Sequence, residues 1–449
     1  MRRAELFAEV AARLGQRRLV WAGLRGEDIE SIADLPQLAA SYSIIGAYDR
    51  RSTVEGIALE NQLGRRVDPE IWDIDDFRGD PSVISFRRSL LQTLSEPSAL
   101  LPYRSSSFLS AIWFARRDRC LHLGLFGAQQ FAFEHKPWVE TAVEGLGIPT
   151  IPWVYIADEE QLRAGELVSE GPVLLRRSRT SGGQGFFRAN SLEEASKYWP
   201  ETDESFVSVA PYYSDVLPIN VGAVVWSDGV SVHHPSVQLI GIEGCVTRPF
   251  GYCGNDFGLA KDFDIGLLSS IEDYTVRIGQ WLRSKGYLGA FGVDYLLDKS
   301  GVLRFTEVNP RFQGSTVASA RLSVESGHPC LVLEHLAALL GVSLPRQRPL
   351  AERMQEASPL SQLVLHWTGV EPVRIDIENF LGGLIESGAS VDACARPSFA
   401  VDSGATLARI TVRKSVTDTG FSLTEPVAAG VRSSLDAMHA HLAMEAQDD

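Results

Sequence analysis

Two rhythms of hydrophobic and polar positions alternate along the first part of the chain. Residues 4–14 carry Leu6, Val10 and Leu14 at helical spacing, on one face. Short apolar runs that end in glycine or polar positions are typical of buried strands, and helical stretches lie between them. These runs occupy residues 18–26, 43–48 and 120–126. The alternation of strand and helix favours an open α/β domain over residues 1–133.

A glycine-rich loop joins two short strands farther along the chain. The strands are predicted at residues 172–178 and 186–189, and the loop between them reads Arg-Thr-Ser-Gly-Gly-Gln-Gly. Backbone N–H groups of such a loop can surround phosphate oxygens, and glycine allows close approach. Arg176 or Arg177 at the base of the loop adds positive charge. The alternative is a plain hairpin turn. The Gly-x-x-x-x-Gly-Lys-Ser/Thr pattern is absent, so the loop is not a P-loop.

Strands and amphipathic helices continue through the second half of the chain. A helix is predicted over residues 264–285, where apolar positions recur at helical spacing. Residues 341–349 read as a linker, and two strands and a final helix beyond it predict a small α+β domain. The strands are predicted at residues 205–213, 220–226, 230–240, 289–297, 303–309, 363–367 and 408–413, and the final helix at 426–446.

The stretch 303–316 combines a strand with charged and amide side chains. Side chains alternate along a strand, so Phe305, Glu307 and Asn309 share one face. A carboxylate and a carboxamide on one face supply the oxygen donors that a hard divalent cation prefers. Arg311 follows directly, and its guanidinium suits a phosphate group. This strand is therefore predicted to end in a binding site.

A hairpin brings a third oxygen donor to the same face. The turn 298–301 joins the strand 289–297 to the strand 303–309. Pairing Leu297 with Val302 places Asp294 opposite Phe305, on the face that carries Glu307 and Asn309. The three side chains predict a metal site. A structural acidic cluster is the alternative, and a one-residue bulge would change the register.

Composition and charge exclude some classes of partner. A chain of 449 residues predicts two to four lobes rather than one core. The formal net charge of −15 argues against nucleic acid or an anionic membrane as the main partner. The five cysteines are scattered, which predicts reduced thiols and a cytoplasmic location. The start of the chain lacks the apolar run of a signal peptide, and no stretch is long and apolar enough to span a bilayer.

Several weaker signals allow more than one interpretation. Lys136 precedes a helix N-terminus, which suits anions, although a surface lysine is the simpler interpretation. Gly23 and Gly26 follow a strand, but the Gly-x-Gly-x-x-Gly pattern of a dinucleotide site is absent. The acidic run 73–76 is interpreted as a solvated loop. Gln238 and Arg248 lie in apolar surroundings, where either could contact a ligand.

The motif Glu307-Val-Asn309-Pro-Arg311 resembles the ATP-grasp superfamily. The segment Gly-Val-Asp294-Tyr before it and the glycine loop upstream belong to the same resemblance, which covers roughly residues 130–320. It implies an ATP-grasp fold of mixed α/β and α+β class. The implied units are an N-terminal pre-ATP-grasp α/β domain at 1–133, a lid at 134–210, a metal and nucleotide subdomain at 211–340, and a C-terminal α+β domain at 341–449.

Within the superfamily, the chain is similar to amino-acid and peptide ligases of the pheganomycin type. The segment 233–241, His-His-Pro-Ser-Val-Gln-Leu-Ile-Gly, carries this narrower resemblance together with the strand around Asn220 and the C-terminal extension. The resemblance implies that Lys136 and Arg176 contact the phosphates of ATP. Arg176 departs from the lysine that is frequent there, while keeping the charge. The loop that closes over the phosphates is matched by Ser181, Gly182, Gly183 and Gly185.

The resemblance also assigns a hinge, a metal site and a phosphate ligand. Residues 208–212 match the hinge whose backbone reads adenine, and Ala210 and Pro211 stand where many members have a ribose-binding glutamate. Arg311 matches the arginine that steadies the transferred phosphate, and Arg248 is assigned to the acid substrate as a third catalytic residue beside Arg311 and Arg176. The hinge contacts are assigned to Val209, Ala210 and Tyr212, and the Mg²⁺ ligands to Asp294, Glu307 and Asn309.

These assignments imply an ATP-dependent carboxylate–amine ligase that forms an amide bond through an acyl phosphate. The expected cofactors are ATP and Mg²⁺, with Mn²⁺ as an alternative, and the expected partners are a small carboxylate and an amine or peptide. A homodimer is left open. His233 and His234 are candidates for the base that deprotonates the amine. The alternatives are another ATP-grasp reaction, such as carboxylation or phosphotransfer, and a nucleotide-binding module without turnover.

Overall fold

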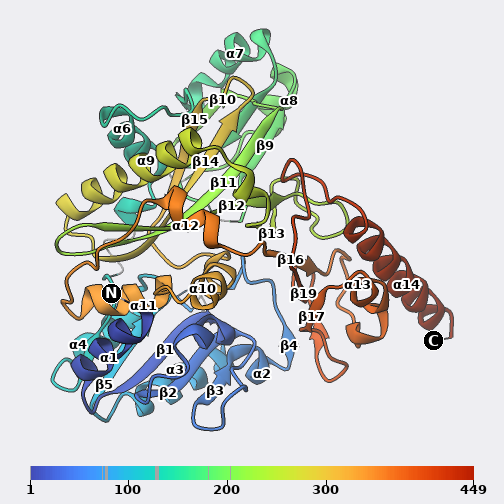
Figure 1. Ribbon diagram of the computed structural model, residues 1–449. Coiled ribbons are helices and arrows are strands. Elements are labelled where there is room, and N and C mark those ends of the chain that lie inside the picture. Colours follow the sequence, from blue (N-terminus) through green and yellow to red (C-terminus); the bar gives the residue numbers. More distant parts are fainter. Residues whose placement is uncertain are drawn as a thin grey trace.

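The fold combines a five-stranded parallel sheet with antiparallel sheets of four and eight strands (Figure 1). The computed structural model describes residues 2–72, 74–75, 79–126, 131–180, 182–202 and 204–448. In Figure 1 the N-terminal domain lies below the central sheet, the lid above it, and the C-terminal strands to the right. A two-stranded parallel sheet joins β4 (Arg65–Arg66) to β18 (Ala400–Val401), so the N-terminal and C-terminal parts of the chain also contact each other.

The N-terminal sheet is five-stranded, in the order β3-β2-β1-β5-β6, and its neighbouring strands are all parallel. The apolar runs are buried because helices cover both faces of such a sheet, as the open α/β domain predicts. Helix α1 (Arg3–Leu14) buries Leu6, Val10 and Leu14, as its spacing predicts. The other elements are β1 (Arg18–Arg25), η1 (Gly26–Ile32), β2 (Leu38–Ile45), β3 (Glu55–Ala58), α2 (Leu59–Leu63), α3 (Pro81–Thr93), β5 (Ser98–Pro102), α4 (Ser107–Arg116) and β6 (Cys120–His122).

The lid is a four-stranded antiparallel sheet in the order β7-β10-β8-β9. Its core joins apolar side chains from the strands to Ala164 and Ala195 on the covering helices. The hairpin β8–β9 carries the glycine-rich loop at its tip, as the sequence predicts. The elements are α6 (Lys136–Gly145), β7 (Val154–Ala157), η2 (Asp158–Arg163), α7 (Ala164–Glu170), β8 (Val173–Arg176), β9 (Phe186–Ala189), α8 (Leu192–Lys197) and β10 (Phe206–Pro211).

The central sheet is eight-stranded and antiparallel, in the order β15-β14-β11-β12-β13-β16-β19-β17. Helix α9 (Ile265–Ser284), capped by Asp264, packs its apolar stripe on one face. The N-terminal domain and α11 (Leu331–Leu339) cover the other face through a shared core. The remaining elements are β11 (Val216–Val225), β12 (Val230–Ile240), β13 (Tyr252–Asp256), η3 (Leu259–Asp262), β14 (Gly289–Asp298), β15 (Leu303–Asn309), α10 (Thr316–Glu325) and α12 (Leu350–Glu356).

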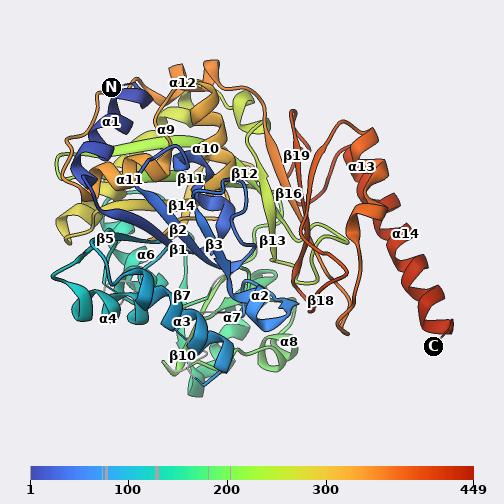
Figure 2. The same ribbon diagram turned by 90° about the horizontal axis from the view of Figure 1, so that it is seen from below.

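The C-terminal strands extend the central sheet (Figure 2). Strand β13 pairs with β16, so the sheet continues across the linker at 341–349. The helices α13 and α14 pack on the C-terminal strands, and their side chains share one core. The expected domain boundaries stay predictions. The elements are β16 (Ser361–His366), η4 (Ile377–Phe380), α13 (Gly382–Glu386), β17 (Ser390–Ala393), β19 (Thr406–Val412) and α14 (Val427–Asp448).

The register of the β14–β15 hairpin differs from the predicted one. Leu297 pairs with Leu303 rather than Val302, because Asp298 accepts hydrogen bonds across a turn one residue longer than assumed. A bulge beside Asp294 then shifts the pairing again, so that Asp294 lies opposite Glu307. The predicted pairing of Asp294 with Phe305 is wrong. The predicted shared face survives, because cross-strand partners point to the same side.

The sequence contains no helix, within the described residues, that is long and apolar enough to cross a membrane. The acidic run at 73–76 lies partly outside the described residues, since Asp73 and Asp76 are not described. Asp75 accepts hydrogen bonds from Ser106 and from the first backbone N–H groups of α4. This acid therefore caps a helix.

Candidate active site

A cavity of about 530 Å³ opens between the N-terminal domain, the lid and the central sheet. The three predicted metal ligands line it together, with Asp294 on β14 and both Glu307 and Asn309 on β15. The lid contributes Thr180 and Gly182 from the glycine loop. The cavity therefore joins the two segments that carried the sequence prediction.

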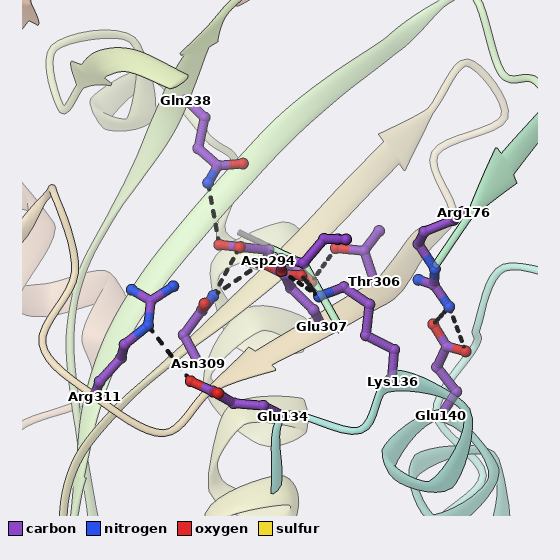
Figure 3. A network of polar contacts seen from close by, with 11 residues as sticks. Glu134, Lys136, Glu140, Arg176, Gln238, Asp294, Thr306, Glu307, Asn309 and Arg311 are labelled. Atoms are coloured by element: carbon purple, nitrogen blue, oxygen red, sulfur yellow. Dashed lines mark hydrogen bonds and ion pairs between the residues drawn. The ribbon is translucent and has the colours of Figure 1, made fainter. Parts of the chain in front are cut away.

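Asp294 is the centre of a hydrogen-bond network on the floor of the cavity (Figure 3). Asn309 Nδ2 donates to Asp294 Oδ2 at 2.9 Å and to Glu307 Oε1 at 3.2 Å. Asn220 Nδ2 donates to Asp294 Oδ1 at 2.5 Å, and Gln238 Nε2 donates to the same oxygen at 3.2 Å. The amide groups thus hold both oxygens of one buried carboxylate.

The two carboxylates have opposite electrostatic surroundings. Burial, and then the negative charge of Glu307, raise the pKa of Asp294 above its usual range. Burial also raises the pKa of Glu307, but Lys136 outweighs it and lowers the pKa below its usual range. Lys136 Nζ lies 2.8 Å from Glu307 Oε2. The close acidic pair therefore needs positive charge, which Lys136 supplies on one side only.

The donor set fits Mg²⁺. Two carboxylates and one carboxamide lie together in one cavity, and their oxygens are the donors that a hard divalent cation prefers. The amide nitrogen of Asn309 faces both carboxylates here, so the amide would turn to offer its oxygen to a cation. Across the described part of the chain no cluster of three or more His, Cys, Asp or Glu side chains could hold a metal, and here the third donor is the amide of Asn309. A cation between Asp294 and Glu307 would also remove the repulsion that raises the pKa of Asp294.

Two basic side chains reach the cavity beside this floor. Lys136 is 7% exposed, and its Nζ also donates to the backbone oxygen of Thr180 at 2.9 Å. It therefore ties the glycine loop to the acidic floor. Arg311 lines the cavity, and its Nε lies 3.7 Å from Glu134 Oε1. Of the three predicted phosphate ligands, Lys136 and Arg311 line the cavity, where an anion could bind next to the predicted cation site.

Comparisons with known proteins identify the architecture. No protein-family model matches the sequence, and no curated protein matches it either. Biotin carboxylase from Campylobacter jejuni, in a β-γ-ATP complex, has a TM-score of 0.60 and 14% identity, covering 89% of this chain and 88% of that one. Carboxyaminoimidazole ribonucleotide synthase from Aspergillus clavatus, complexed with ATP, has a TM-score of 0.60 and 14% identity, covering 94% and 99%.

A third similar structure is the biotin carboxylase domain dimer of the Hydrogenobacter thermophilus 2-oxoglutarate carboxylase, in complex with MgADP, ADP and bicarbonate. Its TM-score is 0.59 at 13% identity, covering 89% of this chain and 87% of that one. The chain has the ATP-grasp fold. Such low identities speak for the fold alone, so the pheganomycin-type subgroup stays a prediction.

The ATP-grasp lid holds its glycine loop close to the rest of the protein. Gly183 has a φ of +77°, and a Cβ there would lie 1.9 Å from the backbone oxygen of Phe250. Gly182 approaches the side chain of Glu70 in the same way, and Gln184 Nε2 donates to the backbone oxygen of Glu70 at 3.3 Å. Gly185 also has a positive φ, and Ser181 lies outside the described residues. The loop therefore bridges the N-terminal domain and the central sheet.

Arg176 and Arg248 do not line the cavity. Arg176 is almost completely buried, and its NH2 group lies 2.7 Å from Glu140 Oε1, with its guanidinium 3.8 Å from the Trp153 ring centre. Figure 3 shows this ion pair beside the network around Asp294. Arg248 lies 3.3 Å from Asp68 of the N-terminal domain. Both arginines have protein partners, and their roles toward ATP or substrate stay predictions.

The predicted adenine hinge lies on β10, the strand at the centre of the lid. Val209 and Ala210 have fully buried side chains, so only their backbone could contact a ligand. The backbone N–H of Tyr212 donates to Pro172 at 2.8 Å, and its ring packs under Arg188. The two candidate bases, His233 and His234, line a different cavity, and neither lines the one beside Asp294.

The sequence analysis singled out Gln238, which donates to Asp294, but it missed the support that Asn220 gives to Asp294 and two lining residues of the N-terminal domain. Asn220 accepts a hydrogen bond from Ser315 Oγ at 2.8 Å while it donates to Asp294. The sequence did contain a signal for Asn220, because burying an asparagine in an apolar strand costs free energy unless its amide is hydrogen-bonded. Two residues of the N-terminal domain, Arg25 and Asp28, also line the cavity. No sequence pattern pointed to these two.

Proposed function

We propose that the chain is an ATP-dependent ligase that activates a carboxylate as an acyl phosphate and joins it to an amine. The observation that carries this proposal is the gathering of Asp294, Glu307 and Asn309 in one cavity with Lys136 and Arg311, on an ATP-grasp fold. An oxygen-rich cation site next to two basic groups is the combination that phosphoryl transfer requires.

The residues of the cavity have distinct roles in this proposal. Asp294, Glu307 and Asn309 would hold Mg²⁺, which supplies charge neutralisation on the phosphates when bound. Arg311 and Lys136 stabilise the remaining negative charge of the transferred group. The carboxylate oxygen attacks the γ-phosphorus and ADP leaves. The amine then attacks the acyl carbon, phosphate leaves, and the amine proton passes to solvent or to a base.

The lid loop protects the reaction from water. Lys136 connects Thr180 of the loop to Glu307 on the floor, and Gln184 connects the loop to the N-terminal domain. An acyl phosphate is hydrolysed readily, so a closed loop favours transfer to the amine. The contacts of Lys136 therefore support a role in closure as well as in phosphate binding.

The part of the cavity lining that the N-terminal domain supplies carries both signs of charge. Arg25 NH1 lies 3.9 Å from Asp28 Oδ1, beyond hydrogen-bond distance. Arg25 Nε and Asp28 Oδ1 are buried without hydrogen-bond partners among the described residues. An amino acid or peptide, with one ammonium and one carboxylate, would satisfy both groups. This supports the finer proposal of an amino-acid or peptide ligase of the pheganomycin type.

Carboxylation of an amine is the second candidate reaction. The similar proteins from Campylobacter jejuni and Aspergillus clavatus are named for biotin carboxylation and for a carboxyamino product. In such a reaction bicarbonate takes the place of the organic acid, and the cation site and Arg311 keep their roles. The two reactions differ in the carboxylate that ATP activates.

One experiment distinguishes the two reactions. ADP release is measured for pairs of amino acids and short peptides, with and without bicarbonate, and the product masses are determined. Ligation predicts ADP release that needs two organic substrates and a product heavier than either. Carboxylation predicts ADP release that needs bicarbonate and one amine. Nucleotide binding without ADP release under any of these conditions would contradict both enzymatic proposals.

A further inference from the structure

A second cavity, of about 510 Å³, lies beside strand β12 and shares no lining residue with the first. Strand β12 contains a bulge here, because Val221 pairs with Pro235 but Ala223 pairs with Val232. The extra residue lets both His233 and His234 line the same cavity. Strand β13 pairs with β12 only from Val237 to Ile240, so these histidines lie beyond that pairing.

His234 is a buried polar group without a partner. Its side chain is 3% exposed, and neither ring nitrogen has a hydrogen-bond partner in the described part of the chain. Burial, and then the charge of Arg353, lower the pKa of His234 to about 3, so the ring is neutral. Buried polar groups are rarely left unpaired, because burial removes their hydrogen bonds to water without a replacement. A ligand in the cavity would supply the missing hydrogen bond.

His233 differs from His234, although the two are adjacent. Its Nε2 lies 3.2 Å from Glu334 Oε2, and Glu334 also accepts hydrogen bonds from Ser231 and Gln347. The one buried acid among the described lining residues is therefore held by other groups, and it does not pair with His234.

Arginines from two further segments face the same space. Arg353 on α12 is 8% exposed, and its Nε donates to the backbone oxygen of Arg348. Its NH2 group has no hydrogen bond in the described residues and lies 3.9 Å from Glu272 Oε1, beyond hydrogen-bond distance. Arg346, in the segment before α12, is exposed and has no ion pair or side-chain hydrogen bond in the described part of the chain. Arg348 also lines the cavity, but Glu356 holds it in a two-point ion pair. Hydrogen-bond donors from three segments, namely β12, α12 and the residues before α12, therefore line the same cavity.

We propose that this cavity binds a small phosphate-bearing anion, held by His234, Arg346 and Arg353. A tetrahedral phosphate accepts hydrogen bonds from several directions, as donors on three separate segments require, whereas a carboxylate accepts mainly in one plane. The site is separate from the cation site and does not depend on the proposed ligase reaction. Because the lining residues come from β12, α12 and the start of α1, a bound anion would connect the N-terminal helix to the central sheet.

The test is calorimetric titration of the full chain, without ATP or Mg²⁺, with inorganic phosphate, pyrophosphate and succinate. Arg346→Ala removes an exposed side chain, so the fold is expected to survive. Arg17→Ala is the matched control. Arg17 is also exposed, but it follows the C-terminal end of α1, whereas Arg2 and Glu5 line the cavity at the N-terminal end. Arg311→Ala reports on anion binding at the first cavity. His234→Leu removes the buried donor without changing the charge of the neutral ring.

Phosphate or pyrophosphate is expected to bind, and Arg346→Ala to weaken binding by about tenfold, the loss of one charge-assisted contact. His234→Leu is expected to weaken binding as well, while Arg17→Ala and Arg311→Ala leave it unchanged. Binding lost in Arg311→Ala but kept in Arg346→Ala would place the anion in the first cavity and overturn the proposal. Tighter binding of succinate than of either phosphate probe, or no binding at about 10 mM of any probe, would overturn it too.

Discussion

Asn220 donates a 2.5 Å hydrogen bond to Asp294, and this contact joins β11 to β14 at the floor of the cavity. The two residues are direct cross-strand partners, so their side chains point to the same face. Ser315 holds the other end of the Asn220 amide. The orientation of the carboxylate proposed to bind a metal is thus set by residues that would not contact the metal.

Asn220→Ala is expected to raise the Mg²⁺ concentration needed for half-maximal ADP release by about tenfold, as loss of a supporting hydrogen bond does at metal sites. The measurement is a Mg²⁺ titration of ADP release, together with direct Mn²⁺ binding. Asn61→Ala, on the exposed surface of α2, is the control. An unchanged metal affinity in Asn220→Ala would show that the contact is only structural.

Glu307→Ala is expected to reduce ADP release by at least about 100-fold, because it removes a cation ligand and the partner of Lys136. The fold should persist, since Glu307 lies at a cavity and does not pack in the core. Turnover is measured beside the circular dichroism spectrum. Near-normal turnover with a native spectrum would refute the metal assignment.

Gly183→Ala is expected to lower the turnover number more than the affinity for ATP. The added methyl group meets the backbone of Phe250, and the backbone has a positive φ that side chains disfavour. The loop would then close poorly while the nucleotide still binds. Gly382→Ala is the control, because a methyl group there meets open space. If both kinetic parameters of Gly183→Ala match those of the control, the loop does not act by closing.

Asp28 gives the stability a pH dependence of known sign. Burial raises the pKa of Asp28 to about 6, and the charge of Arg25 opposes this only in part. The folded state therefore binds a proton more tightly than the unfolded state, so stability decreases as pH rises from about 4 to about 6, by up to about 3 kcal/mol. Urea unfolding at pH 4.5 and 7 should show this loss in the native chain and not in Asp28→Asn. An equal loss of unfolding free energy between pH 4.5 and 7 in both proteins would contradict the raised pKa of Asp28.

Arg176 is expected to contribute to stability through Glu140. Arg176→Met should cost about 3 kcal/mol, because it leaves a buried carboxylate unpaired. The double variant with Glu140→Gln should recover most of that loss. Thermal unfolding of the three variants measures the coupling. ATP affinity of the double variant then tests the phosphate role separately, since a role limited to the ion pair predicts no change.

The β14–β15 hairpin shows how much of the site a local residue pattern can predict. Alternation along 303–309 correctly predicted that Glu307 and Asn309 share a face, and this face also carries Asp294. The predicted pairing contained two errors, a turn that was one residue too short and an omitted bulge. Each error shifts the partner of Asp294 by one residue, so together they shift it by two and leave Asp294 on the predicted face. A bulge is a property of two strands together, so neither strand alone reveals it.

Local residue patterns were enough to predict the strand motif with Glu307, Asn309 and Arg311, the glycine loop, and the alternation of strands and helices. They could not predict which distant groups pair: Asn220 with Asp294, Lys136 with Glu307, and Arg176 with Glu140. Residue spacing follows from the geometry of a single strand or helix. Contacts between segments depend instead on how the sheets pack and on which charged groups this packing brings together.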